Sequence, residues 1–156
     1  MIDLAIPGFG RLALENLVCD YNGTLARDGV LLDGVGARIT ALASKLSVHV
    51  VTGDTFGTAE RALSGLPCAV TLLPEERQVA AKEAFVIRLG AASVVAIGNG
   101  RNDRLMVAAA ALGIAVIGDE GSGADTLQAC DVVVRDVVDA FALLENPQRL
   151  IATLRA

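Results

Sequence analysis

Residues 17–25 read LVCDYNGTL, a short apolar run that ends in an aspartate and passes into a glycine-containing turn. Five more short apolar runs follow along the chain, and a stretch with helical periodicity separates each run from the next. The six runs are Leu17–Cys19, Val48–Thr52, Ala69–Leu73, Val94–Ile97, Ile114–Ile117 and Val132–Val134. Regular alternation of strand and helix predicts right-handed βαβ units. We therefore expect an α/β protein, with a three-layer α/β/α, doubly wound parallel sheet.

The helical stretches complete this pattern. They cover residues 36–46, 56–65, 75–90, 102–112, 121–130 and 136–144. Alternating apolar residues on either side of a Pro-Gly turn predict a hairpin over residues 1–14. A last helix is expected to begin at Pro147, where a missing N–H costs little. No linker or repeat interrupts the chain, so we expect one domain over residues 1–156.

Composition restricts the class of protein. Apolar residues make up 53% of the chain and aromatic residues only 3%, as in a sheet of small aliphatic side chains covered by helices. The net charge is -5 with no basic run, so we expect no nucleic-acid partner. We find no apolar run of about 18 residues and no signal peptide, and therefore expect no membrane partner and a cytoplasmic location. The three cysteines, an odd number without a CxxC pair, indicate buried thiols.

Polar residues gather directly after three of the predicted strands. Asp20–Leu25 follows the first, Thr52–Thr55 the second and Gly98–Asp103 the fourth. In open parallel sheets, ligands bind beyond the carboxyl ends of the strands. We therefore expect a functional site there, although ordinary loops also contain Gly, Asn and Asp.

The order of these motifs resembles the haloacid dehalogenase (HAD) superfamily. VCDYNGTL is similar to its first motif, VVTGD to its second, Lys82 to its lone helical lysine, and AIGNGRNDRLM to its fourth motif. The resemblance extends from Asp20 to Met106 and implies a HAD-like Rossmannoid fold. Within the superfamily, the pattern Asp-x-x-Gly-Thr, Thr-Gly-Asp and Pro…Lys resembles the phosphorylation domains of P-type ATPases and their soluble relatives.

The resemblance implies a role for each matching residue. Asp20 would be the nucleophile that forms an aspartyl-phosphate. Mg²⁺ would be held by the Asp20 carboxylate, the main-chain carbonyl of Asn22 and the side chain of Asn99, with support from Asp103.

Four residues would contact the phosphate. The Thr52 hydroxyl and the N–H groups of Gly53 and Gly23 would bind its oxygens, and Lys82 would stabilise its charge. Purely structural interpretations are also open for two of these residues. Thr52 could be a turn or helix-capping residue, and Lys82 a solvated lysine on a helix.

Two residues depart from the family pattern. Asn22 occupies the position of the usual acid/base Asp and cannot exchange a proton, which predicts slow turnover. Asn99 replaces a carboxylate and removes one negative charge from the metal site. We therefore expect a phosphohydrolase or phosphotransferase, with a catalytically impaired phosphate- or metal-binding regulatory module as the alternative. A Rossmann oxidoreductase is disfavoured because no GxGxxG follows the first strand.

Structural roles are expected for three other polar residues. Asp54 is expected to cap a helix that starts near Phe56, Arg101 to face solvent, and His49 to pack within its strand.

The spans between the motifs are too short to contain the cap domain of many relatives. We therefore expect an open, capless site, a small phosphorylated substrate or a phosphorylated macromolecule as its partner, and a homo-oligomer.

Overall fold

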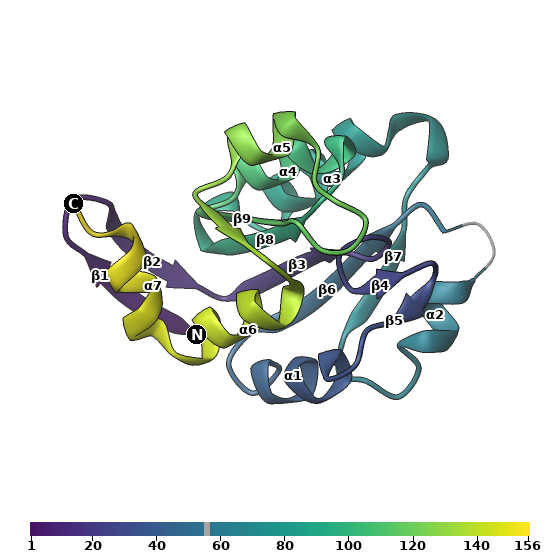
Figure 1. The fold of residues 1–156 in the computed structure, drawn as a ribbon, viewed down its shortest axis with the longest axis horizontal. Helices are drawn as coiled ribbons and strands as arrows, with labels where there is room; N and C mark the ends of the chain where they lie inside the picture. The colour runs from purple at the N-terminus through teal and green to yellow at the C-terminus, as the bar shows by residue number, and fades with distance from the viewer. Residues whose placement is uncertain (55–56) are drawn as a thin grey trace.

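A six-stranded parallel sheet forms the centre of the computed structural model, which describes residues 1–54 and 57–156 (Figure 1). Its strand order is β10-β9-β8-β3-β6-β7. The strands are β3 (Asn16–Asp20), β6 (Ser47–Thr52), β7 (Ala69–Leu72), β8 (Val94–Gly98), β9 (Leu112–Val116) and β10 (Val132–Val134). All six predicted strands are present, and the predicted α/β sheet is confirmed.

Burial explains the continuous apolar runs of the central strands. Every residue of β8 and β9 is buried, as are four of the five residues of β3. A parallel strand inside a sheet is covered on both faces, so it carries no polar alternation. Leu17 and Cys19 pack into the larger core cluster, whereas Val18 packs into the smaller cluster on the opposite face.

Helices cover both faces of the sheet and complete the three predicted layers (Figure 1). The larger cluster contains residues of α1 (Val35–Leu42), α2 (Thr58–Ala62) and α6 (Val137–Glu145). The smaller cluster contains residues of α3 (Gln78–Arg88) and α4 (Arg104–Ala109), and α5 (Ala124–Ala129) lies beside α4. None of the helices described is long and apolar enough to cross a membrane.

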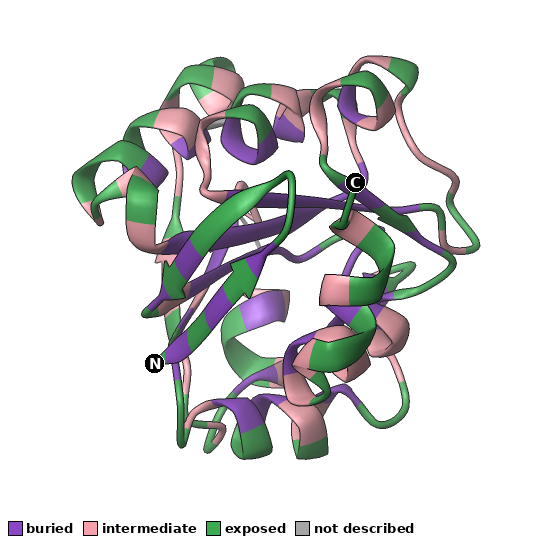
Figure 2. Ribbon diagram, turned by 90° about the vertical axis from the view of Figure 1, so that its left-hand side faces the viewer, coloured by how far each residue is buried: buried purple, intermediate pink, exposed green. Residues whose placement is uncertain are grey.

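The predicted N-terminal hairpin is present and projects from one end of the sheet (Figure 1). β1 (Ile2–Ile6) pairs antiparallel with β2 (Gly10–Leu14), and residues along both strands alternate between buried and exposed (Figure 2). The last helix, α7 (Pro147–Leu154), starts at Pro147 as predicted and packs against β1. The Ala156 N–H donates to the Pro7 carbonyl at 3.0 Å, so the C-terminus is held at the turn of the hairpin.

The predicted helices are longer than the observed ones at their ends. The helix predicted over 102–112 is a 3-10 turn (Arg101–Asp103) followed by α4, and Ala110 is extended, so that β9 begins at Leu112. Likewise, a 3-10 turn (Glu75–Arg77) precedes α3, and another (Ala91–Ser93) precedes β8. Helix ends lack backbone partners and are the least determined by periodicity.

A short hairpin that was not predicted follows directly after the first motif. β4 (Ala26–Arg27) pairs with β5 (Val30–Leu31) through a two-residue turn. Asp28 and Gly29 both have positive φ, 51° and 78°, as a tight hairpin turn requires. The buried Tyr21 donates its hydroxyl to the Gly29 carbonyl at 3.1 Å and anchors the tip. The Asp28-Gly29 pair, which is typical of a two-residue hairpin turn, is the feature of the sequence that could have predicted this hairpin.

Candidate active site

The three polar loops identified in the sequence meet at one edge of the sheet. β3 lies between β6 and β8: the chain runs from β3 to β6 and β7 on one side of it, and then crosses to β8, β9 and β10 on the other side. The carboxyl ends of these strands carry Asp20, Thr52 and the loop that begins at Asn99. This is the topological switch point of the sheet, where ligands bind in such folds.

Lys82 joins two carboxylates beneath these loops. Its Nζ lies 2.6 Å from Asp20 Oδ1 and 2.6 Å from Asp103 Oδ1, and the Lys82 and Asp103 side chains are fully buried. Burial lowers the pKa of Lys82, but the two carboxylates outweigh this effect and raise it overall. Lys82 is therefore a buried cation between two anions, and the interpretation as a solvated lysine is wrong.

Asp20 is a strongly perturbed carboxylate. Burial and repulsion from Asp103 raise its pKa to about 7, although Lys82 and the Thr24 hydroxyl act in the opposite direction. One ammonium group does not neutralise two buried carboxylates, so the cluster attracts a proton or another cation.

Thr24 and Asn99 surround the second oxygen of Asp20. The Thr24 hydroxyl lies 3.3 Å from Asp20 Oδ2 and 3.2 Å from Asn99 Oδ1. The Asn99 Nδ2 donates to the Gly121 carbonyl at 3.0 Å, which leaves the amide oxygen to accept from the Thr24 hydroxyl. Two hard oxygen atoms therefore converge on one hydroxyl, and such oxygen atoms are the ligands that hard divalent cations prefer.

Asp103 has both oxygens occupied. Its Oδ1 accepts from Lys82, and its Oδ2 accepts from the N–H groups of Asn99 (3.0 Å) and Gly100 (2.9 Å). The carboxylate therefore fixes the loop after β8 and the lysine together.

Gly23 makes room for the Asn99 amide. It has φ +80°, and a Cβ placed there would lie 2.8 Å from Asn99 Oδ1. Its N–H, which was predicted to bind phosphate, donates instead to the Ala26 carbonyl at 2.8 Å. The contact that Gly23 makes with the site is thus steric.

The remaining predicted residues lie around this cluster. Thr52 is buried, and its hydroxyl accepts the Asp54 N–H at 3.2 Å at the turn into Gly53. Asp54 accepts the Ala59 N–H of α2 at 2.7 Å, as expected of a helix-capping carboxylate, although Phe56 itself lies outside the described residues. Asn22 is exposed, and its side chain has no hydrogen bond to any other residue described.

Comparison with known proteins gives a single consistent fold. No family model matches the chain. An uncharacterised protein of Methanocaldococcus jannaschii is 53% identical over 62 residues, which cover 40% of this chain and 67% of that protein. A structure described as a HAD superfamily (subfamily III A) hydrolase from Legionella pneumophila superimposes with a TM-score of 0.72 at 17% identity, over 91% of this chain and 87% of the other.

Two further solved structures carry bound ions. The 3-deoxy-D-manno-octulosonate 8-phosphate phosphatase of Moraxella catarrhalis, in complex with magnesium and phosphate, has a TM-score of 0.71 at 18% identity. The cobalt-bound phosphatase of the same kind from Haemophilus influenzae has a TM-score of 0.71 at 16% identity. Each comparison covers 92% of this chain and 94% of the other. The chain has the fold of the HAD superfamily.

In this HAD fold, neither inter-motif span contains a separate domain among the described residues. Between β3 and β6 lie only the β4–β5 hairpin and α1. Between β6 and Lys82, the described part holds α2, β7 and the start of α3.

Gln78 is a site residue that the sequence analysis missed. Its Oε1 accepts from the Asn102 side chain at 3.2 Å, and its Cδ lies 2.6 Å from where a Gly53 Cβ would be. It therefore spans the loops after β6 and β8. Gln78 precedes Lys82 by four residues on α3, so the two lie on the same face of the helix, and this spacing could have predicted its place near the site.

Proposed function

We propose that the chain is a phosphohydrolase or phosphotransferase of HAD type that works through an aspartyl-phosphate at Asp20. The observation that carries the proposal is the buried Lys82 Nζ, held 2.6 Å from both Asp20 and Asp103 at the switch point of the sheet. A perturbed carboxylate with a specific charge partner at such a position is characteristic of a functional site. The solved phosphatases with this fold support the proposal.

The oxygen atoms present fit a divalent cation, for which we propose Mg²⁺. The Asp20 carboxylate, the Asn99 amide oxygen and the main-chain carbonyl of Asn22 would hold it, while Asp103 would position the loop of Asn99. When bound, the cation would neutralise charge between Asp20 and the phosphate. Because Asn99 is an amide, only one carboxylate would contact the cation directly, and we expect modest affinity.

The chemical step needs a nucleophile and a stabilised phosphoryl group. An Asp20 oxygen attacks phosphorus, the bond from phosphorus to the ester oxygen breaks, and the leaving alkoxide takes a proton from water. Thr52 and the Gly53 N–H would bind phosphate oxygens, and Lys82 would offset the developing charge. Water then attacks phosphorus and releases phosphate and the Asp20 carboxylate.

Asn22 sets the expected rate. A positioned acid/base residue contributes about 10²–10⁴-fold, and an amide cannot supply that contribution. We therefore expect slow turnover and a phosphoenzyme of long lifetime. This long lifetime is the property that we propose the chain shares with P-type ATPases.

The substrate class in our proposal is a small phosphate ester or a phosphorylated macromolecule. The structural neighbours include enzymes named for 3-deoxy-D-manno-octulosonate 8-phosphate and phosphoserine. We also propose a homo-oligomer in which a second copy covers the open site, and light scattering that shows a monomer at high concentration would contradict it.

The proposal is tested with p-nitrophenyl phosphate, with and without Mg²⁺. We expect Mg²⁺-dependent phosphate release that Asp20→Asn abolishes and that Asn22→Asp raises by about 10-fold or more. Acid quench should trap a phosphoenzyme in the wild type. If neither Asn22→Asp turnover nor a phosphoenzyme is found, the chain is the binding module favoured by Asn22 and Asn99.

A further inference from the structure

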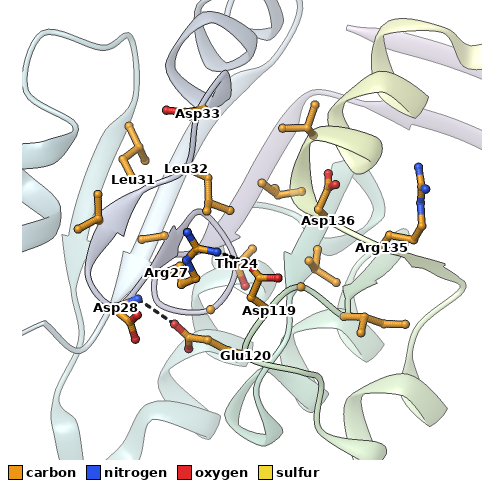
Figure 3. Close-up of a pocket in the computed structure, with 18 residues that line it drawn as sticks. Thr24, Arg27, Asp28, Leu31, Leu32, Asp33, Asp119, Glu120, Arg135 and Asp136 are labelled. Carbon is orange, nitrogen blue, oxygen red and sulfur yellow. Dashed lines mark hydrogen bonds and ion pairs between the residues drawn. The ribbon is translucent and has the colours of Figure 1, made fainter.

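A cleft of about 880 Å³ opens beside the buried carboxylates (Figure 3). Its walls are the β4–β5 hairpin, the loop after β9 and the first turn of α6. Asp20 does not line this cleft, but Thr24 does, and the Thr24 hydroxyl lies 3.3 Å from Asp20 Oδ2. A group attached to a phosphate at Asp20 would therefore reach the cleft past Thr24.

Negative charge dominates the lining. Five carboxylates and two guanidinium groups border the cleft, so three carboxylates are in excess. They are Asp28, Asp33, Asp119, Glu120 and Asp136, with Arg27 and Arg135.

Each arginine of the lining already has a carboxylate partner. Arg27 forms an ion pair with Asp119 across the cleft, as Figure 3 shows. Arg135 pairs with Asp139 at 3.0 Å, and its side chain is 87% exposed.

Two of the carboxylates are uncompensated. Glu120 is engaged, since it accepts the Asp28 N–H at 3.1 Å, and Asp136 caps α6 by accepting the Asp139 N–H at 2.9 Å. The side chains of Asp28 and Asp33, in contrast, have no hydrogen-bond or ion-pair partner within the described part of the chain. Asp28 lies in the turn of the β4–β5 hairpin and Asp33 just after β5, and both side chains border the cleft at its exposed rim (Figure 3).

Apolar side chains provide the rest of the surface. Leu31, Leu32, Val116 and Val137 line the cleft between the charged groups. Carboxylates over an aliphatic surface suit a carbon skeleton that carries hydroxyl or ammonium groups.

We propose that this cleft holds the leaving group of the substrate, and that the substrate is a phosphate monoester of a polyol or amino sugar with no second anionic group. The inference rests on the proposed function and adds a charge rule to it. A second anion on the substrate would meet Asp28 and Asp33 without a free cation among the lining residues, and like charges brought together in an interface are strongly disfavoured. The rule separates this chain from phosphatases whose substrates carry a carboxylate, as an octulosonate does.

The test compares three six-carbon esters that differ in charge: glucosamine 6-phosphate, glucose 6-phosphate and 6-phosphogluconate. We expect kcat/KM to be at least about 10-fold lower for 6-phosphogluconate than for the other two, with glucosamine 6-phosphate equal to or above glucose 6-phosphate. The difference should shrink at high salt, because salt screens exposed charges.

Variants assign the effect to the cleft. Asp33→Asn and Asp28→Asn should each raise kcat/KM for 6-phosphogluconate by about 3-fold relative to kcat/KM for glucose 6-phosphate. Glu15→Gln is the matched control, because it removes an exposed carboxylate at the opposite end of β3.

The outcomes separate the charge rule from the proposed function. Equal efficiencies on the three esters, or a preference for 6-phosphogluconate, would overturn the charge rule while p-nitrophenyl phosphate turnover upheld the proposed function. No Asp20-dependent turnover of any ester would overturn both.

Discussion

Replacing Lys82 by Met should destabilise the protein more at pH 8 than at pH 5. In the wild type, Lys82 is the cation between two buried carboxylates, each 2.6 Å from its Nζ. Removing one partner of a buried ion pair costs about 3–5 kcal/mol because the other charge is left uncompensated. For a domain of this length, that loss corresponds to a fall in Tm of about 6–20 °C.

The pH dependence follows from Asp20. Its folded-state pKa is raised from 3.8 to about 7, so its protonated form adds stability that is fully present below pH 3.8 and is lost as the pH rises through 7. Without Lys82 this pKa rises further, since the lysine is one of the groups that lower it. At pH 5 the variant therefore keeps Asp20 neutral and avoids most of the repulsion from Asp103.

Urea denaturation of the metal-free protein at pH 5, 6, 7 and 8 measures the effect. Lys45→Met is the matched control: Lys45 is the only other lysine, and it is exposed, so its free energy of unfolding should change by less than about 0.5 kcal/mol. Adding Asp20→Asn to the Lys82→Met variant should restore part of the loss at pH 8. A Lys82→Met variant as stable as the wild type at pH 8, or equally destabilised at both pH extremes, would contradict the role given to the buried lysine.

Three other predictions test separate parts of the structure. Gly23→Ala should lower the free energy of unfolding by about 1–3 kcal/mol, because the added Cβ would meet the Asn99 amide. The same variant should bind Mg²⁺ more weakly in calorimetry. Gly65→Ala is the control, since Gly65 also has a positive φ, +81°, but has open space around it, so that only backbone strain is added. Gln78→Ala should raise KM for p-nitrophenyl phosphate with little change in protein stability. Gly53→Ala should raise KM in the same way, because its Cβ would displace the Gln78 amide. The effects of the two substitutions should therefore not add in the double variant. Burial lowers the pKa of His49 below 6.5, so its contribution to stability is present above pH 6.5 and is lost as the pH falls. His49 is the only histidine in the sequence, and His49→Leu should therefore reduce the loss of unfolding free energy at acidic pH in urea denaturation. An unchanged dependence of stability on pH would contradict this role.

Local pattern accounts for what the sequence predicted well. Central strands that are buried on both faces must be apolar throughout, so the runs around Val95 and Ile114 were recognisable. The run Leu17–Cys19 stops directly before Asp20, so the position of Asp20 at the carboxyl end of a strand follows from the sequence alone. Helix ends and the β4–β5 hairpin were less determined, because capping and turn contacts extend over only a few residues.

The sheet, the order of its motifs and the choice of Asp20 and Lys82 as candidate site residues follow from the amino-acid sequence. Three features follow only from the folded structure: Lys82 also binds Asp103, the Asn99 amide lies between the Gly121 carbonyl and the Thr24 hydroxyl, and the Gly23 N–H is already occupied. The folded structure alone assembled the acidic cleft, whose walls come from segments about 90 residues apart, such as Arg27 and Asp119. The physical reason is that apolar periodicity records which face of an element is buried, whereas a hydrogen bond depends on the direction of two side chains brought together by the fold.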